Sequence, residues 1–414
     1  MPAAPALAAL VEPLFGGELP VRLRAWDGSE HGPQGAPVVV LRNRRALRRL
    51  LWSPGELGLA QAYVTGDLDV EGDLFDGFRR IWATVRSGSV TGTRPPVGPA
   101  LRTALRYGLV GLPPRAPASQ ARLSGPLHSL LRDRAAISHH YDLSNEFYEL
   151  ILDPHMAYSC GYFRTPDDTV EQAQTNKLSL IADKLGVVPG GRHLDIGCGW
   201  GSLSLYLAEK RDVQVLGVTI SQEQKAFIDK RIADRGLADR VEIRLQDYRE
   251  VPELGFDSVS SIEMGEHVGA ENYPTFVRLI ESRLRVGGRA LIQQMSRRDR
   301  PGGGDFIEAY IAPDMHMRPV GETVALIEDG GLEVRDVHMM REHYVKTILA
   351  WYASFESHWD RAVELVGEEV ARVWRLYMVG SALVFEEGRM GVDQILAVKK
   401  SPDGRSDMPL VRAW

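Results

Sequence analysis

The sequence predicts an α/β protein in which a doubly wound parallel sheet follows a smaller N-terminal domain of α+β or mostly helical structure. From about residue 180, short strand patterns alternate with helical patterns, which is typical of a parallel sheet covered by helices on both faces. A glycine-rich turn follows the first of these strands. The length of 414 residues leaves room for two or three domains of about 150 residues each.

The N-terminal domain is expected to span residues 1–85, where the patterns are short and mixed. Runs rich in valine indicate strands, and the spacing of apolar residues indicates helices. The expected strands are residues 21–26 and 38–41, and the expected helices are residues 44–52, 56–63 and 75–85.

A linker is expected over residues 86–132, because Ser, Gly, Pro and Arg dominate there. Between Asp76 and Asp133 there is no acidic residue, whereas nine arginines occur. A solvated basic linker and a surface for anionic lipid both explain this composition. Apolar residues between the arginines favour the lipid surface. These residues are Leu101, Leu105, Tyr107, Leu109 and Leu112.

The remaining residues, 133–414, are assigned to one large domain that contains the alternating pattern. Its strands are expected at residues 192–196, 213–219, 241–245, 256–262, 289–294 and 394–399. Its helices are expected at residues 202–210, 222–235, 273–284, 320–330 and 345–355, with a longer one within 359–385.

Composition excludes several classes of protein. A net charge of −6 provides no global basic field for nucleic acid, and no uncharged apolar run reaches the ~18 residues that cross a bilayer. Two cysteines are too few for a disulfide framework and suit a reducing cytosol, and the N-terminus lacks the basic start of a signal peptide. His139-His140 has no Asp, Glu or Cys at ligand spacing, so no metal site is expected.

The turn after the first strand has the pattern acid-x-Gly-x-Gly-x-Gly, from Asp195 to Gly201. An NAD site needs G-x-G-x-x-G, with an acid about 20 residues further on. The second strand ends instead in Thr219 and Ser221, and the third is followed by Asp247-Tyr248. Each group alone could be an ordinary loop, but three groups at successive strand ends favour a nucleotide site. The pattern resembles motif I of S-adenosylmethionine (SAM) methyltransferases.

These motifs together resemble the cyclopropane-fatty-acid synthases, including the mycolic acid cyclopropane synthases, over about residues 135–400. The N-terminal domain resembles the extension of the phospholipid-acting members, so we expect it to face lipid. The resemblance lies in residues 140–145, 158–160, 195–201, 217–221, 256–257, 266–269 and 343–344. It implies the class I SAM methyltransferase fold and SAM as the cofactor. The implied SAM-binding residues are Tyr141, Tyr158, Ser159, Asp195, Gly197, Cys198, Gly199, Gly201, Thr219, Ser221, Gln224, Asp247, Tyr248 and Ile262.

The resemblance also implies a catalytic group, in which the family holds bicarbonate as the general base. The matching positions are Cys160, Glu266, Gln293, Met295 and Tyr344. The family has a histidine in a Leu-His-Thr-Ile-like strand end, where this chain has Gln293 within Ile292-Gln293-Gln294-Met295. The family's Gly and Phe near the glutamate are Glu263 and Gly265 here. Glu263 and His267 are further catalytic candidates.

The expected reaction is methyl transfer to the cis double bond of an unsaturated phospholipid acyl chain, with oleoyl as the expected chain. A weakened base at Gln293 would let a hydride shift precede proton loss, which gives a 10-methylene chain for a separate reductase. Cyclopropane formation, methylation of a small molecule and a non-catalytic binding protein are the alternatives. We expect the protein in the cytoplasm, peripheral at an anionic inner membrane surface, and a homo-oligomer is left open.

Overall fold

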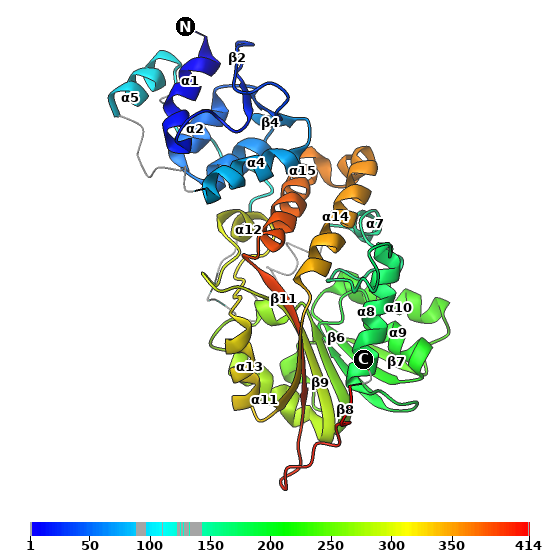
Figure 1. Ribbon diagram of the computed structural model, residues 1–414. Helices are drawn as coiled ribbons and strands as arrows, with labels where there is room; N and C mark the ends of the chain where they lie inside the picture. Colours follow the sequence, from blue (N-terminus) through cyan, green and yellow to red (C-terminus); the bar gives the residue numbers. More distant parts are fainter. Residues whose placement is uncertain are drawn as a thin grey trace. The chain divides into compact units, whose positions relative to one another are not determined.

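The computed structural model describes residues 2–87, 97–109, 111–121, 125, 127, 132, 143–412 and 414. It divides into two compact units, each of which gathers segments that are distant in the sequence (Figure 1). Unit 1 comprises residues 1–120, 304–310 and 366–383. Unit 2 comprises residues 121–303, 311–365 and 384–414.

Unit 1 is built on a small mixed sheet with strand order β2-β1-β3-β4. Its strands are β1 (Arg22–Arg24), β2 (Glu30–His31), β3 (Val38–Leu41) and β4 (Leu68–Glu71). Its helices are α1 (Ala3–Val11), η1 (Glu12–Phe15), α2 (Arg45–Trp52), α3 (Glu56–Val64), α4 (Leu74–Arg86), α5 (Val97–Arg106) and α12 (Asp305–Tyr310). Residues 366–383 of α15 (Trp359–Glu386) complete the unit. The small α+β composition agrees with the sequence prediction.

The division into units differs from the three expected segments at two places. Part of the expected linker is folded, because α5 lies beside α1 (Figure 1) and Tyr107 and Leu109 are buried with Ala3 and Ala4. The C-terminal residues 366–383 also pack into unit 1.

This second difference has a polar cause. Arg372 of α15 is buried, and it donates to the carbonyl oxygens of Tyr63 at 2.6 Å and Leu68 at 3.0 Å. It also pairs with Asp69 at 3.1 Å. Contacts that span about 300 residues leave no local pattern, so the sequence alone could not place this segment.

Unit 2 contains a seven-stranded sheet with the order β10-β11-β9-β8-β5-β6-β7. Strands β5 to β9 are parallel, and β10 and β11 add an antiparallel edge. The strands are β5 (Arg192–Ile196), β6 (Gln214–Thr219), β7 (Val241–Leu245), β8 (Phe256–Ile262), β9 (Leu284–Ser296), β10 (Glu333–Met339) and β11 (Gly391–Val398). The expected parallel core is confirmed, and β10 was not predicted.

Helices cover both faces of this sheet, with one apolar core on each side. The helices of unit 2 are α7 (Asn145–Glu149), α8 (Val170–Leu185), α9 (Ser202–Arg211), α10 (Gln222–Asp234), α11 (Tyr273–Arg283), α13 (Val320–Asp329) and α14 (Arg341–Ser357). Two short 3-10 helices, η2 (Tyr248–Glu250) and η3 (Gly265–His267), follow β7 and β8. The carboxyl ends of β5 to β8 therefore meet at one edge, which positions the candidate site.

In the part of the chain that the structure describes, no helix is both long enough and apolar enough to cross a bilayer. The same residues contain no group of three or more His, Cys, Asp or Glu side chains that could hold a metal ion.

Candidate active site

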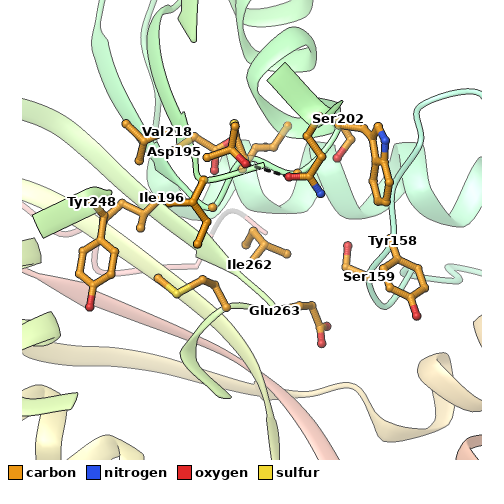
Figure 2. A pocket seen from close by; sticks show the side chains of 18 of the residues that line it. Tyr158, Ser159, Asp195, Ile196, Ser202, Val218, Tyr248, Ile262 and Glu263 are labelled. Atoms are coloured by element: carbon orange, nitrogen blue, oxygen red, sulfur yellow. Dashed lines mark hydrogen bonds between the residues drawn. The ribbon is translucent and has the colours of Figure 1, made fainter. Parts of the chain in front are cut away.

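A pocket in unit 2 opens at the carboxyl ends of β5, β6, β7 and β8 and contains about 1270 Å³ of empty space, including the part open to solvent. Figure 2 shows Tyr248 at one end and Tyr158 and Ser159 at the other, with Ile262 and Glu263 between them. Eleven of the predicted SAM-binding residues line it. They are Tyr158, Ser159, Asp195, Gly197, Cys198, Gly199, Thr219, Gln224, Asp247, Tyr248 and Ile262.

Three predicted SAM-binding residues do not line this pocket in the described structure. Tyr141 lies outside the described residues. Gly201 has a φ of 82° at the start of α9, where a Cβ would come within 3.1 Å of Ile228, so it shapes the turn. Ser221 accepts a hydrogen bond from Gln224 N at 3.2 Å and caps α10.

The end of β5 is fixed by a buried polar network. Asp195 accepts hydrogen bonds from Ser204 of α9 at 2.7 Å and Ser260 of β8 at 2.8 Å. Ser260 also contacts the ring of His193 at 2.9 Å. Burial raises the pKa of Asp195 and lowers the pKa of His193 to about 3. This network joins two strands and a helix beneath the glycine turn.

The carboxyl ends of β6 and β7 provide polar and aromatic groups. Thr219 donates to Gln224 at 2.8 Å, which places both side chains at the pocket wall. Asp247 accepts from the backbone N–H of Arg249 at 2.9 Å and from its guanidinium at 2.7 Å. Tyr248 packs edge-on against Phe276, with ring centroids 5.5 Å apart. An acid and a ring at one end suit the ribose and adenine of a nucleoside.

Sequence reasoning missed Lys177 of α8, a fully buried side chain that lines the pocket. Its ammonium donates to Ser159 Oγ at 2.7 Å. Burial lowers the pKa of Lys177, and the carboxylates of Asp153, Glu263 and Asp195 oppose this shift. In the sequence it is an ordinary lysine of a helical pattern, so nothing marked it.

Aromatic rings surround Tyr158 at the same end of the pocket. Its ring centroid lies 5.2 Å from that of Trp351 and 6.4 Å from that of Trp200. Trp200 follows Gly199 in the glycine turn and donates to Asn145 at 2.8 Å. Such π-faces can stabilise a positive charge beside them. Trp200 lines the pocket but was not predicted.

Glu263 stands where the pocket meets the predicted catalytic group. It follows β8 with a φ of 54°, in the left-handed region, and its backbone N–H donates to Gln293 O at 2.7 Å. Gln293 Nε2 donates to Glu263 Oε1 at 2.8 Å, and Cys160 N donates to the same oxygen at 3.5 Å. Glu263 Oε2 is buried and has no hydrogen-bond partner among the described residues. Burial raises the pKa of Glu263 to about 7.

Glu266 is completely buried one turn further on. Its Oε1 accepts from Met295 N at 2.7 Å, and its Oε2 has no partner within the described structure. Burial, and secondarily the Glu263 carboxylate, raise the pKa of Glu266 to about 8. The structure therefore places two carboxyl groups with weakened acidity close together.

The other predicted catalytic residues are Cys160 and Tyr344, which are buried, and His267, which lines the pocket. Cys160 is buried, with Sγ 3.3 Å from Gly161 O and 3.6 Å from Met340 O, and burial raises its pKa. A thiol with a raised pKa is not a nucleophile at neutral pH. Tyr344 is buried four residues after Met340 and packs against Trp351 and Phe385. His267 lines the pocket.

The family described as mycolic acid cyclopropane synthetase matches residues 128–395, which is more than half of the chain. The chain belongs to this family. It is 40% identical over 409 residues to a probable fatty acid methyltransferase of Mycobacterium tuberculosis, covering 96% of this chain and 95% of the relative. It is 32% identical over 401 residues to the tuberculostearic acid methyltransferase UfaA1 of the same organism, covering 93% and 89%.

A solved structure agrees with this family assignment. Mycolic acid cyclopropane synthase CmaA1, complexed with SAH and CTAB, has a TM-score of 0.61 and 31% identity, and covers 64% of this chain and 97% of that one. The predicted class I SAM methyltransferase fold is confirmed, and the chain is a SAM-dependent methyltransferase of the cyclopropane synthase family.

Proposed function

We propose that this enzyme transfers a methyl group from SAM to the cis double bond of an unsaturated phospholipid acyl chain, with oleoyl as the expected chain, and forms a 10-methylene product. The observation that carries the proposal is the Glu263 carboxylate, which lines the pocket with one partnerless oxygen among the described residues. The names of the relatives, a probable fatty acid methyltransferase and a tuberculostearic acid methyltransferase, support a fatty acid chain as the methyl acceptor.

The pocket residues fit SAM. Asp247 can accept hydrogen bonds from the nucleoside end, and the Gly197–Gly199 turn lets the cofactor approach the backbone. When bound, SAM supplies a methyl group on a sulfonium, which an alkene can attack. The rings of Tyr158 and Trp200 lie at the other end, and the Glu263 carboxylate lies between the two ends. These groups can stabilise a cation on the acyl chain.

The bicarbonate that the family holds fits these residues poorly. Met295 N already donates to Glu266, and Gln293 Nε2 already donates to Glu263. The negative charge of bicarbonate would also raise the pKa values of the two buried carboxyls still further. We therefore assign proton removal to Glu263, with Gln293 as a positioning residue that holds its Oε1.

Product choice follows from when the proton leaves. Methyl addition at C10 of oleoyl leaves a cation at C9, and loss of a methyl proton at that stage closes a cyclopropane. If a hydride moves from C10 to C9 first, the cation sits at C10, and loss of a methyl proton to Glu263 forms C10=CH2. Because Gln293 restrains the Glu263 carboxylate on one oxygen, we expect late proton removal. A separate reductase would then convert the methylene group to a methyl branch.

The test is incubation with dioleoyl phospholipid and methyl-labelled SAM, followed by chromatography and mass spectrometry of the fatty acid methyl esters. The methylene and cyclopropane products are isomers of equal mass, so retention must separate them. Labelled methylene product is expected, and cyclopropane alone overturns the assignment. Label only in small polar acceptors would favour a small-molecule methyltransferase, and no SAH with any lipid would favour a binding protein.

A substitution tests the role of Gln293. Gln293→His should shift product toward cyclopropane, because it removes the amide that restrains Glu263 and restores the histidine with which the family holds its base. Gln246→His is the matched control, since Gln246 lines the same pocket but bonds to the Glu250 carbonyl, away from the carboxyl pair. Equal product ratios in both variants and the unmodified enzyme would refute this role.

A further inference from the structure

Unit 1 carries an exposed surface on which arginines and large apolar side chains alternate. We name it the arginine–leucine surface, and it lies on α2 with its N-cap residue and on the end of α5 with the turn that follows. It consists of the exposed residues Arg44, Leu51, Trp52, Arg106 and Leu112 and of half-buried Arg48. Leu112 is 85% exposed, Trp52 56% and Leu51 55%, although such residues are usually buried.

The α2 residues of this surface share one helix face. Arg44, Arg48 and Trp52 are spaced four apart, which stacks them along a single stripe. Arg44 and Arg48 line the same surface depression together with Trp26. The stripe therefore carries one exposed guanidinium group, one half-buried guanidinium group and an indole.

The turn after α5 is fixed against this stripe. Arg48 donates to Gly108 O at 3.0 Å, and the Trp52 indole donates to Gly111 O at 3.1 Å. These two bonds fix the turn, and exposed Leu112 follows Gly111 directly in the chain. Apolar groups at the surface are thus held in place by the backbone of the turn.

Two packed aromatic rings lie between Arg44 and Arg106. The Arg44 guanidinium lies 5.7 Å from the centroid of Trp26, whose ring packs edge-on against Tyr107 at 5.7 Å. The Arg106 guanidinium lies 5.7 Å from the Tyr107 centroid on the same ring pair. Among the described residues, Arg44 and Arg106 form no ion pair with a carboxylate, whereas neighbouring Arg42 pairs with Asp69. Their charge is available to an anion.

We propose that the arginine–leucine surface docks unit 1 on an anionic phospholipid bilayer. Guanidinium groups attract the phosphates of the headgroups, and Trp and Leu side chains insert at the level where headgroup meets acyl chain. A protein partner would require shape complementarity, whereas this surface presents charge and separate apolar side chains. The inference rests on the proposed function for its lipid, but it concerns unit 1 alone.

The test is sedimentation of the full-length protein with vesicles of phosphatidylglycerol and phosphatidylcholine, and with phosphatidylcholine alone. Arg44→Gln with Arg106→Gln removes two charges, and binding to anionic vesicles should weaken about 30-fold, the equivalent of about 2 kcal/mol. Leu51→Ser with Leu112→Ser should weaken binding about tenfold. Arg278→Gln and Leu254→Ser, at exposed positions of unit 2, are the matched controls and should bind like the unmodified protein.

Three outcomes overturn the proposal. They are no binding of the unmodified protein to anionic vesicles, equal binding by the surface variants and the controls, and a dimer that dissociates in the leucine variant. The last would assign the surface to a second copy of the chain. SAH formation from detergent-dispersed dioleoyl phospholipid separates the two proposals. Docking variants should retain it, whereas its absence in the unmodified enzyme would refute the proposed function and leave the vesicle result standing.

Discussion

Replacing Glu266 by glutamine should make the free energy of unfolding less dependent on pH. The side chain is completely buried, and its Oε2 has no hydrogen-bond partner in the described ranges. Burial and the Glu263 carboxylate raise its pKa from the ordinary 4.5 to about 8. At about 1.4 kcal/mol per pH unit, this difference corresponds to roughly 5 kcal/mol between the two protonation states.

The sign follows from proton binding. Between pH 4.5 and 8 the folded state holds a proton on Glu266 that the unfolded chain has lost, so stability falls as pH rises. Buried His193 has the opposite effect, because its pKa is lowered to about 3, but that effect ends near its ordinary value of 6.5. The interval from pH 6.5 to 8 therefore lies above the histidine effect, and Glu266 contributes roughly 2 kcal/mol there.

The assay is urea unfolding at pH 6.5, 7.5 and 8.5. The introduced glutamine would keep the acceptor for Met295 N but add a buried amide donor, so the absolute stability is less informative than its pH dependence. Relative to the native chain, Glu266→Gln should gain about 2 kcal/mol from pH 6.5 to 8.5. Glu271→Gln, at an exposed position nearby, should follow the native curve. Parallel curves for Glu266→Gln and the native chain would refute the reasoning.

Three more predictions concern the pocket and its walls. Asp247→Ala should weaken SAH binding about tenfold or more in calorimetry, because a charged hydrogen-bond acceptor is lost. Glu263→Gln should lower turnover about 100-fold and abolish the rise in rate as pH passes about 7, with SAH affinity kept. Gly265→Ala should destabilise by about 2 kcal/mol in urea, because its Cβ would lie 2.0 Å from Gln294 Oε1, and Gln294→Ala should relieve most of this cost.

The parallel core of unit 2 was predictable from the sequence because its signals are local. Each strand is a short apolar run that ends in a recognisable group, and the carboxyl ends of parallel strands share one edge. Asp195, Thr219 and Asp247 therefore meet at one pocket although they are distant in sequence. Glu266 was predicted instead from the family resemblance, and Glu263 from a departure from the family pattern; both follow β8.

Contacts that depend on tertiary packing were not predictable. In the sequence, Lys177 has the pattern of an ordinary polar position of a helix. In the structure it is buried, and its ammonium donates to Ser159. Arg372 lies in a helical pattern of the C-terminal region, and nothing local indicates that it binds the carbonyl oxygen of Tyr63 in unit 1. Composition alone suggested a linker over 86–132, which includes α5, because arginines and leucines do not reveal which side chains other elements cover.

The departures from the family pattern near β8 and β9 come in contacting pairs. The family has Gly and His where this chain has Glu263 and Gln293, and these two side chains are joined at 2.8 Å. The family has Phe and Thr where this chain has Gly265 and Gln294, and the absence of a side chain at Gly265 makes room for Gln294, which accepts from Tyr273. The first pair keeps one titratable group but moves it from β9 to the turn after β8. Glu263 lines the pocket and Gln293 does not, so the change places the titratable group at the pocket wall, as the proposed role of Glu263 requires.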